Sequence, residues 1–390
     1  MSDQNQSPID VWVLAGQSNM EGCAWLQGAL APDERVWAFG SAGQWSIAKD
    51  PLHWFWESIT PVHQELRRAG MTMADRQISD DEWAQRERAT RKTGAGLGIA
   101  FGKLMADSTG KRIGLIAAAH GGTSLEQWNP LYKSMGGHSL YGAMLERIRL
   151  AGGTLRGILW YQGESDTTLI DMANSYERRF DEWIAAVRAD TGIPDLPVIA
   201  VQIGRVIEPP SREGIWPGWD IVREAQRTLP HRVSNAMVTT SVDLPLVDLI
   251  HIDTMGLIRL GKRMARLAIA GKQIGPRVTS IQGVTSPAGI VNAIRVRFEG
   301  VAGGGWASAN PSLVRGFEVT LPDTRSRNPL YVVNAFIDPT SAGGTDVVVL
   351  LNREMDEDTQ LGYGLGINPC CDLTDGEDTP LLSFLPQRVM

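Results

Sequence analysis

The feature that most constrains the fold is an alternation of short apolar runs with amphipathic helical patterns, which extends to about residue 275. The runs typical of strands lie at 11–14, 36–39, 113–118, 158–161, 198–201 and 237–241. Helical patterns lie at 98–108, 141–151, 173–190, 221–228 and 259–270. This order predicts a parallel sheet with helices on both faces, a three-layer α/β/α arrangement. In such sheets the functional site lies beyond the carboxyl ends of the strands, near a switch in strand order.

The character of the sequence changes after Gly275-Pro276. Runs of β type at 293–298, 316–321, 331–337 and 347–351 are separated by Gly, Pro and Asp, with almost no helical periodicity. We therefore expect an α/β domain over residues 1–275 and a smaller all-β domain over 276–390. The polar, Trp-containing stretch 51–93 predicts an insertion over the edge of the sheet.

Composition argues against several kinds of partner. The formal charge of −7 disfavours nucleic acid, and no apolar run approaches the roughly 20 residues that cross a bilayer. The three cysteines form no disulfide framework, and no Cys/His cluster has metal-ligand spacing, so we expect no metal site. The polar opening MSDQNQSPID lacks the pattern of a secretory signal. Two interpretations remain open: the protein is cytoplasmic, or it is exported and its signal has been removed. Nothing in the sequence indicates the oligomeric state.

The strongest local signal is the segment Gly16-Gln17-Ser18-Asn19-Met20, directly after the first predicted strand. A serine on a strand-to-helix turn exposes its hydroxyl at the top of the sheet, near helix amides that can stabilise an oxyanion. The same serine could instead only cap a helix. Position alone leaves both interpretations open.

A nucleophilic serine needs a base, and His251 stands out among the six histidines because Asp248 precedes it by three residues. That spacing places both side chains on one side of a helical turn or tight loop. There the carboxylate can orient the imidazole and stabilise its charged form. The pair follows the last strand of the alternating region, at the carboxyl end of the predicted sheet.

Two further segments lie where oxyanion donors are wanted, at 120–124 and 160–166, each after a predicted strand. Glycine at 121 and 122 lets the backbone approach a substrate closely, and Gln162 can donate from its amide. Each segment could also be an ordinary glycine turn.

Together the four segments resemble the conserved blocks of the SGNH (GDSL-like) hydrolase superfamily, and more narrowly the sialate O-acetylesterase-like carbohydrate esterases. GQSNM matches residues 16–20, Gly-Gly-Thr matches 121–123, WxQGExD matches 160–166, and DxxH matches 248–251. The resemblance covers most of residues 9–270. It implies the flavodoxin-like, three-layer α/β/α sheet of SGNH hydrolases, followed here by the smaller all-β domain.

The resemblance also implies a mechanism for hydrolysis of O-acetyl esters on carbohydrates. Ser18 would attack the ester carbonyl, with His251 as general base and Asp248 holding its tautomer. The backbone amides of Ser18 and Gly122 and the side chain of Gln162 would bind the oxyanion. The expected partner is an acetylated sugar or oligosaccharide. No cofactor is expected, because protein groups complete the chemistry.

Other residues are expected to support the site or to contact substrate. Gln17 and Glu164 are supporting residues, and Glu164 either braces the neighbouring loops or orients His251 itself. Among the tryptophans, Trp128 is expected nearest the site. His120 could line the acyl pocket or serve only as a structural hydrogen-bonding group. The remaining tryptophans could stack on sugars or pack in the core.

Three alternatives remain at this stage. Glu164 and Asp166 could be the paired carboxylates of a glycosidase, although that leaves Ser18 and the Asp248–His251 pair unexplained. The chain could be an SGNH esterase or thioesterase acting on other acyl groups, although no apolar lid is evident. It could also be a non-catalytic carbohydrate-binding protein, which would predict loss of a triad member, and all three are present.

Overall fold

The computed structural model describes residues 9–207, 214–285, 289, 291–308, 310–320 and 329–390. The opening residues on which the expectation about location depends, and position 321 at the end of one predicted strand, lie outside this part. The larger region contains a seven-stranded sheet in the order β4-β3-β6-β1-β7-β8-β9. These strands are β1 (Asp10–Gly16), β3 (Val36–Phe39), β4 (Trp45–Ile47), β6 (Ile113–Ala117), β7 (Thr154–Tyr161), β8 (Val198–Gln202) and β9 (Ala236–Thr240).

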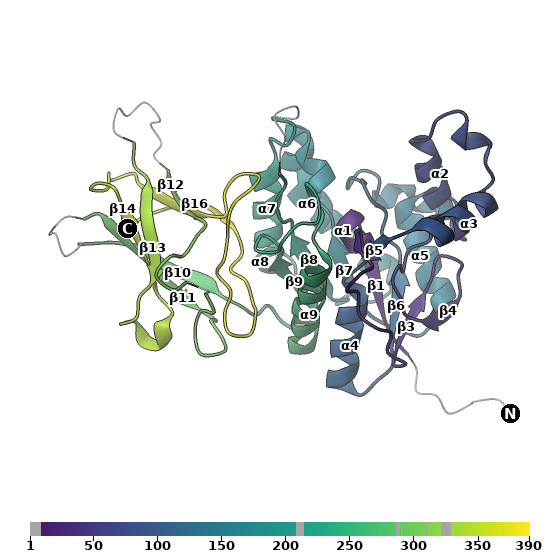
Figure 1. Ribbon diagram of the computed structural model, residues 1–390, viewed down its shortest axis with the longest axis horizontal. Helices are drawn as coiled ribbons and strands as arrows, with labels where there is room; N and C mark the ends of the chain where they lie inside the picture. Colours follow the sequence, from purple (N-terminus) through teal and green to yellow (C-terminus); the bar gives the residue numbers. More distant parts are fainter. Residues whose placement is uncertain (1–8, 208–213, 286–288, 290, 309, 321–328) are drawn as a thin grey trace.

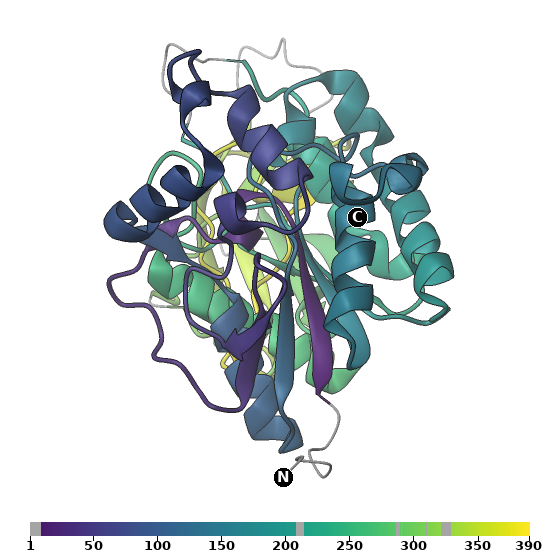
Figure 2. The ribbon, with the colours of Figure 1, turned by 90° about the vertical axis from the view of Figure 1, so that its right-hand side faces the viewer.

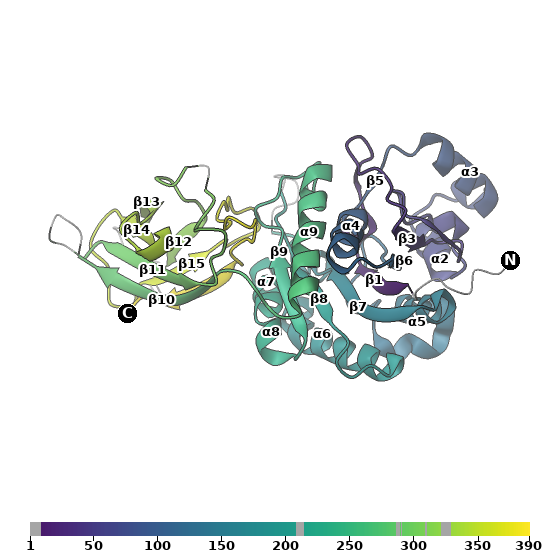
Figure 3. The ribbon, with the colours of Figure 1, turned by 90° about the horizontal axis from the view of Figure 1, so that it is seen from below.

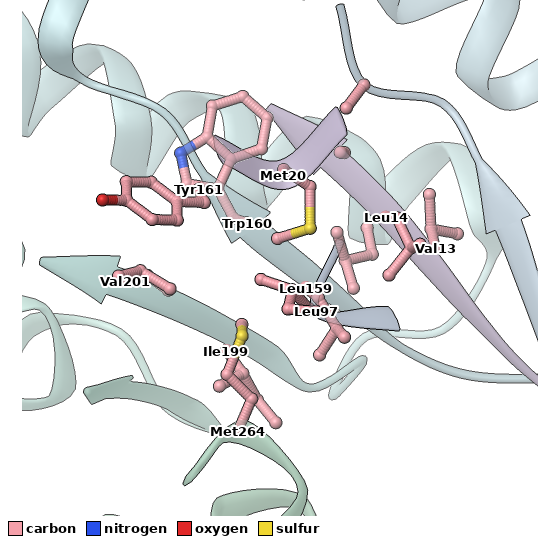
Figure 4. Packing of buried hydrophobic residues seen from close by; sticks show 14 of the residues in the cluster. Val13, Leu14, Met20, Leu97, Leu159, Trp160, Tyr161, Ile199, Val201 and Met264 are labelled. Atoms are coloured by element: carbon pink, nitrogen blue, oxygen red, sulfur yellow. The ribbon is translucent and has the colours of Figure 1, made fainter. Parts of the chain in front are cut away.

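The sheet is parallel except for β4, which pairs antiparallel with β3. Every residue of β1, β6 and β8 is buried, as expected for strands covered on both faces. The helices are α1 (Ser18–Glu21), α4 (Gly98–Thr109), α5 (Leu140–Ala151), α6 (Ile170–Thr191), α7 (Trp219–Arg227), α8 (Leu229–Arg232) and α9 (Thr254–Ala270). Figure 3 shows α4 and α9 on one side of the sheet and α5 and α6 on the other, which confirms the predicted three layers. In Figure 4, Met20 and Met264 pack with β-strand side chains such as Leu159 in the core.

The chain between β4 and β6 forms a separate group of short elements. They are η1 (Phe55–Glu57), α2 (Val62–Ala69), η2 (Asp75–Gln77), α3 (Asp80–Thr90) and β5 (Thr93–Ala95), which pairs with β2 (Ala24–Trp25). Ser79 caps α3 by accepting a hydrogen bond from the Glu82 N–H, and acidic residues fill the first turn of that helix. In Figure 2, α2 and α3 lie toward the end of the sheet at which β1 finishes, so this group lies near the carboxyl ends of the strands.

The C-terminal region holds two antiparallel sheets (Figure 1). One has the order β10-β11-β14-β13 and the other β12-β15-β16. Their strands are β10 (Arg277–Val284), β11 (Ala293–Glu299), β12 (Phe317–Thr320), β13 (Val332–Ile337), β14 (Val347–Leu351), β15 (Gln360–Tyr363) and β16 (Phe384–Arg388), with the short helix η6 (Ala342–Gly344). Side chains of both sheets share one hydrophobic cluster. The predicted β-rich region is confirmed, whereas its boundary at residue 275 stays a prediction.

Ion pairs join α9 to this region. Arg263, whose side chain is 1% exposed, lies 2.7 Å from Asp243 and 2.8 Å from Asp378. Arg259, one turn earlier and 40% exposed, contacts the same two carboxylates. The two arginines therefore share partners but differ in burial.

This difference predicts unequal costs of substitution. Arg263→Met should lower the free energy of unfolding by about 3 kcal/mol, because it leaves buried carboxylate and carbonyl acceptors without their donor. Arg259→Met should lower it by less than about 1 kcal/mol, because solvent screens that pair. Urea denaturation of both variants measures the two losses. Equal losses would show that burial does not set the contribution of Arg263.

Candidate active site

Four loops meet at the carboxyl end of the sheet. β1 lies between β6 and β7, and the segments after these three strands carry Ser18, the Gly121–Gly122 turn and Glu164. The loop after β9 brings in His251. All of them line one cavity of about 1070 Å³. The structure therefore brings together the four segments that the sequence singled out, at the switch in strand order.

A sharp turn places Ser18 in this cavity. Gly16 has φ +130°, and a Cβ there would lie 2.1 Å from the carbonyl oxygen of Tyr161. Glycine thus allows β1 to approach β7 closely, and the Gln17 N–H donates to Tyr161 O at 2.8 Å. The chain then enters α1 at Ser18. The N–H of the first residue of a helix has no intrahelical acceptor, so the Ser18 N–H is available to an oxyanion.

His251 contacts Asp248 as the spacing predicted. Nδ1 of the ring lies 2.7 Å from Asp248 Oδ2, which leaves Nε2 as the nitrogen available to the serine. Asp248 Oδ1 also accepts from the backbone N–H groups of Ile250 and His251. Burial raises the pKa of Asp248, but these hydrogen bonds and the His251 charge outweigh it, so the pKa lies below its ordinary value. The carboxylate therefore stays charged beside the imidazole.

Glu164 acts on the histidine loop through Asn19. Asn19 Nδ2 donates to Glu164 Oε1 at 3.0 Å, and Asn19 Oδ1 accepts from the Ile252 N–H at 3.0 Å. Burial raises the pKa of Glu164. Of the two carboxylates considered for orienting His251, Asp248 is the one that contacts the ring. Asn19 went unnoticed as a brace in the sequence, although it lies inside the GQSNM segment.

The Gly121–Gly122 turn lies directly against the serine. A Cβ on Gly121 would lie 3.4 Å from the Ser18 Cβ. Gly122 has φ +69°, and a Cβ there would meet nothing within 4 Å, so glycine is favoured for its backbone conformation and the turn borders open space. This is where the sequence placed a second oxyanion donor.

Gln162 does not face the cavity. Its side chain is fully buried, and Nε2 donates to Asp166 Oδ2 at 2.6 Å and to the Thr123 carbonyl at 3.0 Å. Both amide hydrogens are therefore engaged elsewhere. This corrects the expectation of an oxyanion donor: Gln162 braces two loops instead. Gln17 does line the cavity, and its Oε1 lies 3.4 Å from the Gly163 and Ser165 N–H groups.

The two residues expected to contact substrate differ in placement. Trp128 is fully buried, donates from Nε1 to Thr123 Oγ1 and packs on Trp160, so it supports the site from beneath and the expectation of contact is corrected. His120 lines the cavity while being 5% exposed. It stacks on Phe55 with ring centroids 4.3 Å apart.

His120 belongs to a buried histidine group. Its Nδ1 lies 3.0 Å from His63 Nδ1, and His53 Nε2 accepts from the Ala119 N–H, which makes Nδ1 of His53 the donor to Glu21 O. Burial, aided by the charges of nearby arginines, lowers the pKa of His53 and that of His120 to about 3. These rings are therefore neutral in the folded protein.

The low pKa of His53 predicts a pH-dependent contribution to stability. Unfolded His53 binds a proton below about pH 6.5, whereas folded His53 does not. The contribution of His53 to the free energy of unfolding is therefore complete above that pH and decreases as pH falls. The stability difference between wild type and His53→Gln should narrow by about 2 kcal/mol from about pH 7.5 to about pH 5. Urea denaturation at both values measures it. A difference that does not change with pH would mean that His53 titrates normally in the fold.

The outer wall of the cavity comes from the group between β4 and β6. Lining residues there include Phe55, Trp56, Arg67, Trp83, Glu87 and Arg91. The rings of Trp56 and Trp83 stack with centroids 5.7 Å apart. On another segment, Trp216 also faces the cavity. The sequence predicted this stretch as a polar, Trp-containing insertion over the edge of the sheet, but it did not place its helices beside Ser18, because nothing local relates them to that residue.

In the part of the chain that the structure describes, no helix has the length and apolar character needed to cross a bilayer. Within that same part, no group of three or more His, Cys, Asp or Glu side chains is arranged to hold a metal ion.

The chain is similar in sequence to known proteins. Residues 8–270 match the family described as carbohydrate esterase, sialic acid-specific acetylesterase. An Arabidopsis thaliana protein named probable carbohydrate esterase is 30% identical over 67% of this chain and 92% of its own length. Human sialate O-acetylesterase is 29% identical over 40% of this chain and 31% of its own length.

Solved structures extend the likeness to the fold. A carbohydrate acetylesterase from Xanthomonas citri, 21% identical, covers 96% of this chain and 80% of its own, with a TM-score of 0.66. The matched part of this chain therefore includes the C-terminal sheets. From the matched family and the Arabidopsis relative, we conclude that this chain belongs to the carbohydrate esterase family of sialic acid-specific acetylesterases.

Proposed function

We propose that the chain is a serine esterase that removes acetyl groups from sugar hydroxyls through an acetyl-enzyme intermediate. The observation that carries this proposal is the Asp248–His251 hydrogen bond in a loop that lines the same cavity as Ser18. A carboxylate, an imidazole and a serine hydroxyl around one cavity are the groups that acyl transfer needs.

The proposed reaction proceeds in two steps. Ser18 Oγ attacks the acetyl carbon while His251 Nε2 takes its proton, and the backbone N–H groups of Ser18 and Gly122 stabilise the oxyanion. The oxyanion collapses, the sugar oxygen leaves and takes the proton from His251, and the acetyl group remains on Ser18. Water then attacks with His251 as base, which releases acetate and restores the serine.

The sugar is assigned to the leaving-group side for a structural reason. The cavity is far larger than an acetyl group, and Trp56, Trp83 and Trp216 give its outer part aromatic surfaces. Aromatic faces with neighbouring polar groups suit a sugar ring, which carries both C–H and O–H groups. Glu164 and Asp166 do not act as a glycosidase pair in this proposal, because Asp166 is fully buried and bonded to Gln162 and to the Leu125 N–H.

Substrate comparison tests the proposal. We expect acetate release from an aryl acetate and from an O-acetylated oligosaccharide, and at least about 10-fold lower kcat/KM for the aryl octanoate. Equal or faster cleavage of the octanoate would favour an esterase for longer acyl chains. Binding of the oligosaccharide without acetate release would favour a non-catalytic carbohydrate-binding protein.

A further inference from the structure

Glu21 is a buried carboxylate in the cavity that the proposed reaction does not use. It ends α1, three residues after Ser18, and is 8% exposed. Its Oε2 accepts a hydrogen bond from the Gly121 N–H at 2.9 Å. A Cβ on Gly121 would lie 3.0 Å from this oxygen and 3.4 Å from the Ser18 Cβ. The carboxylate, the glycine turn and the nucleophile are therefore packed against one another.

The backbone of Glu21 is fixed to the same strand end. His53 Nδ1 donates to Glu21 O at 2.9 Å, while His53 Nε2 accepts from the Ala119 N–H at 3.2 Å. The main chain and the side chain of Glu21 are thus both connected to residues 119–121. Movement of the glycine turn relative to α1 would break these hydrogen bonds.

The charge of Glu21 needs compensation, because a carboxylate this close to a developing oxyanion would oppose catalysis. Burial raises the pKa of Glu21 above its ordinary value, and the charges of Arg67 and Arg91 offset only part of that effect. Arg91 Nη2 lies 3.7 Å from Glu21 Oε1. Arg91 is 10% exposed and is held by hydrogen bonds to the His53 carbonyl and to Glu87 of α3.

We infer that Glu21 is a positioning residue for the oxyanion site. Its carboxyl group holds the Gly121–Gly122 turn against Ser18, so that the Gly122 N–H stays directed at the oxyanion, and Arg91 offsets the negative charge when the group is ionised. The inference rests on the proposed function. It also links α3 to the reaction centre through the contacts Glu87–Arg91–Glu21–Gly121.

Four variants assayed on an aryl acetate test this role. Glu21→Ala should lower kcat by about 10- to 100-fold with KM within about threefold, because the turn loses its acceptor but the binding surface remains. Glu21→Gln keeps an acceptor oxygen and should retain kcat within about fivefold. Arg91→Gln should lower kcat by about 10-fold, because the carboxylate is then uncompensated. The double variant Glu21→Gln/Arg91→Gln should recover most of that loss.

Glu182→Ala, on the exposed face of α6, is the matched control and should leave kcat unchanged. Thermal unfolding shows which variants are folded. If Glu21→Ala does not fold, the inference is tested by Glu21→Gln, Arg91→Gln and their double variant. Wild-type kcat in folded Glu21→Ala, or a double variant no faster than Arg91→Gln, would overturn the inference. An enzyme that needs Ser18 but not Glu21 contradicts this inference alone. An enzyme that does not need Ser18 contradicts the proposed function.

Discussion

Replacing Ser18 with alanine is expected to lower kcat/KM for an aryl acetate by about 10³-fold or more. The variant keeps the cavity, the Asp248–His251 pair and the glycine turn, so substrate still binds while no oxygen is present to accept the acetyl group. Residual activity would come from water attacking a substrate that is still bound and polarised. Because Ser18 is only half-buried and its side chain forms no part of the main core, the substitution should leave the free energy of unfolding unchanged.

The matched control for this prediction is Ser175→Ala in α6, because the Ser175 hydroxyl bonds to a carbonyl of its own helix and the residue is not part of the cavity lining. It should keep wild-type kcat/KM. If Ser18→Ala also keeps wild-type activity, the serine is not the nucleophile. A water-based hydrolysis would then have to be assigned to other groups of the cavity.

His251→Ala is the second large effect, with an expected loss in kcat of about 10³-fold or more. Without the imidazole nothing in the proposed reaction removes the proton from Ser18 or returns it to the sugar oxygen. Asp248→Asn should lose about 10²-fold, since a neutral amide stabilises the imidazolium less and favours the wrong tautomer. Combining Ser18→Ala with His251→Ala should add little further loss, because the two groups act as one unit.

His231→Ala, an exposed histidine on α8, controls for loss of a histidine elsewhere and should keep its activity. Glu164→Gln shows which of the two carboxylates, Asp248 or Glu164, orients the His251 ring. If Asp248 orients the ring, Glu164→Gln loses less activity than Asp248→Asn. The reverse order would make Glu164 the orienting group and Asp248 a residue of the loop only.

Much of the fold was predictable because its signals are local. β1, β6 and β8 are buried on both faces and read as continuous apolar runs, which is why their positions were clear. The same is true of α4, α6 and α9, whose periodicity is long enough to recognise. By contrast, β10 has an irregular burial pattern with exposed and half-buried positions, and it was not predicted. It pairs antiparallel with β11, the next strand along the chain.

The site was predictable where one motif sits on one strand end. Ser18, Gly122, Asp248 and His251 each follow a strand of the sheet, and parallel topology alone brings strand ends together. Gln162 and Trp128 show the limit of this reasoning. Both have the right chemistry and the right position in the chain, but which way a side chain points depends on its neighbours. Asp166 and Thr123 draw the Gln162 amide away from the cavity.

The proposed roles of Glu21 and Arg91 could not be predicted from the sequence, for a related reason. Glu21 bonds to Gly121, which is 100 positions away, and Arg91 reaches Glu21 from the end of α3. No spacing rule connects them, since the contact depends on how α2 and α3 fold over the strand ends. Interactions between an inserted segment and the sheet become visible only in three dimensions.

The measurement that tests the central claim most directly is mass spectrometry of the protein quenched with acid during turnover of an aryl acetate. The account predicts one acetyl group on the peptide that contains Ser18, and none on that peptide in Ser18→Ala. The account would be contradicted if hydrolysis ran at the full wild-type rate, no acetyl group appeared on that peptide at any quench time, and the Ser18→Ala variant were active.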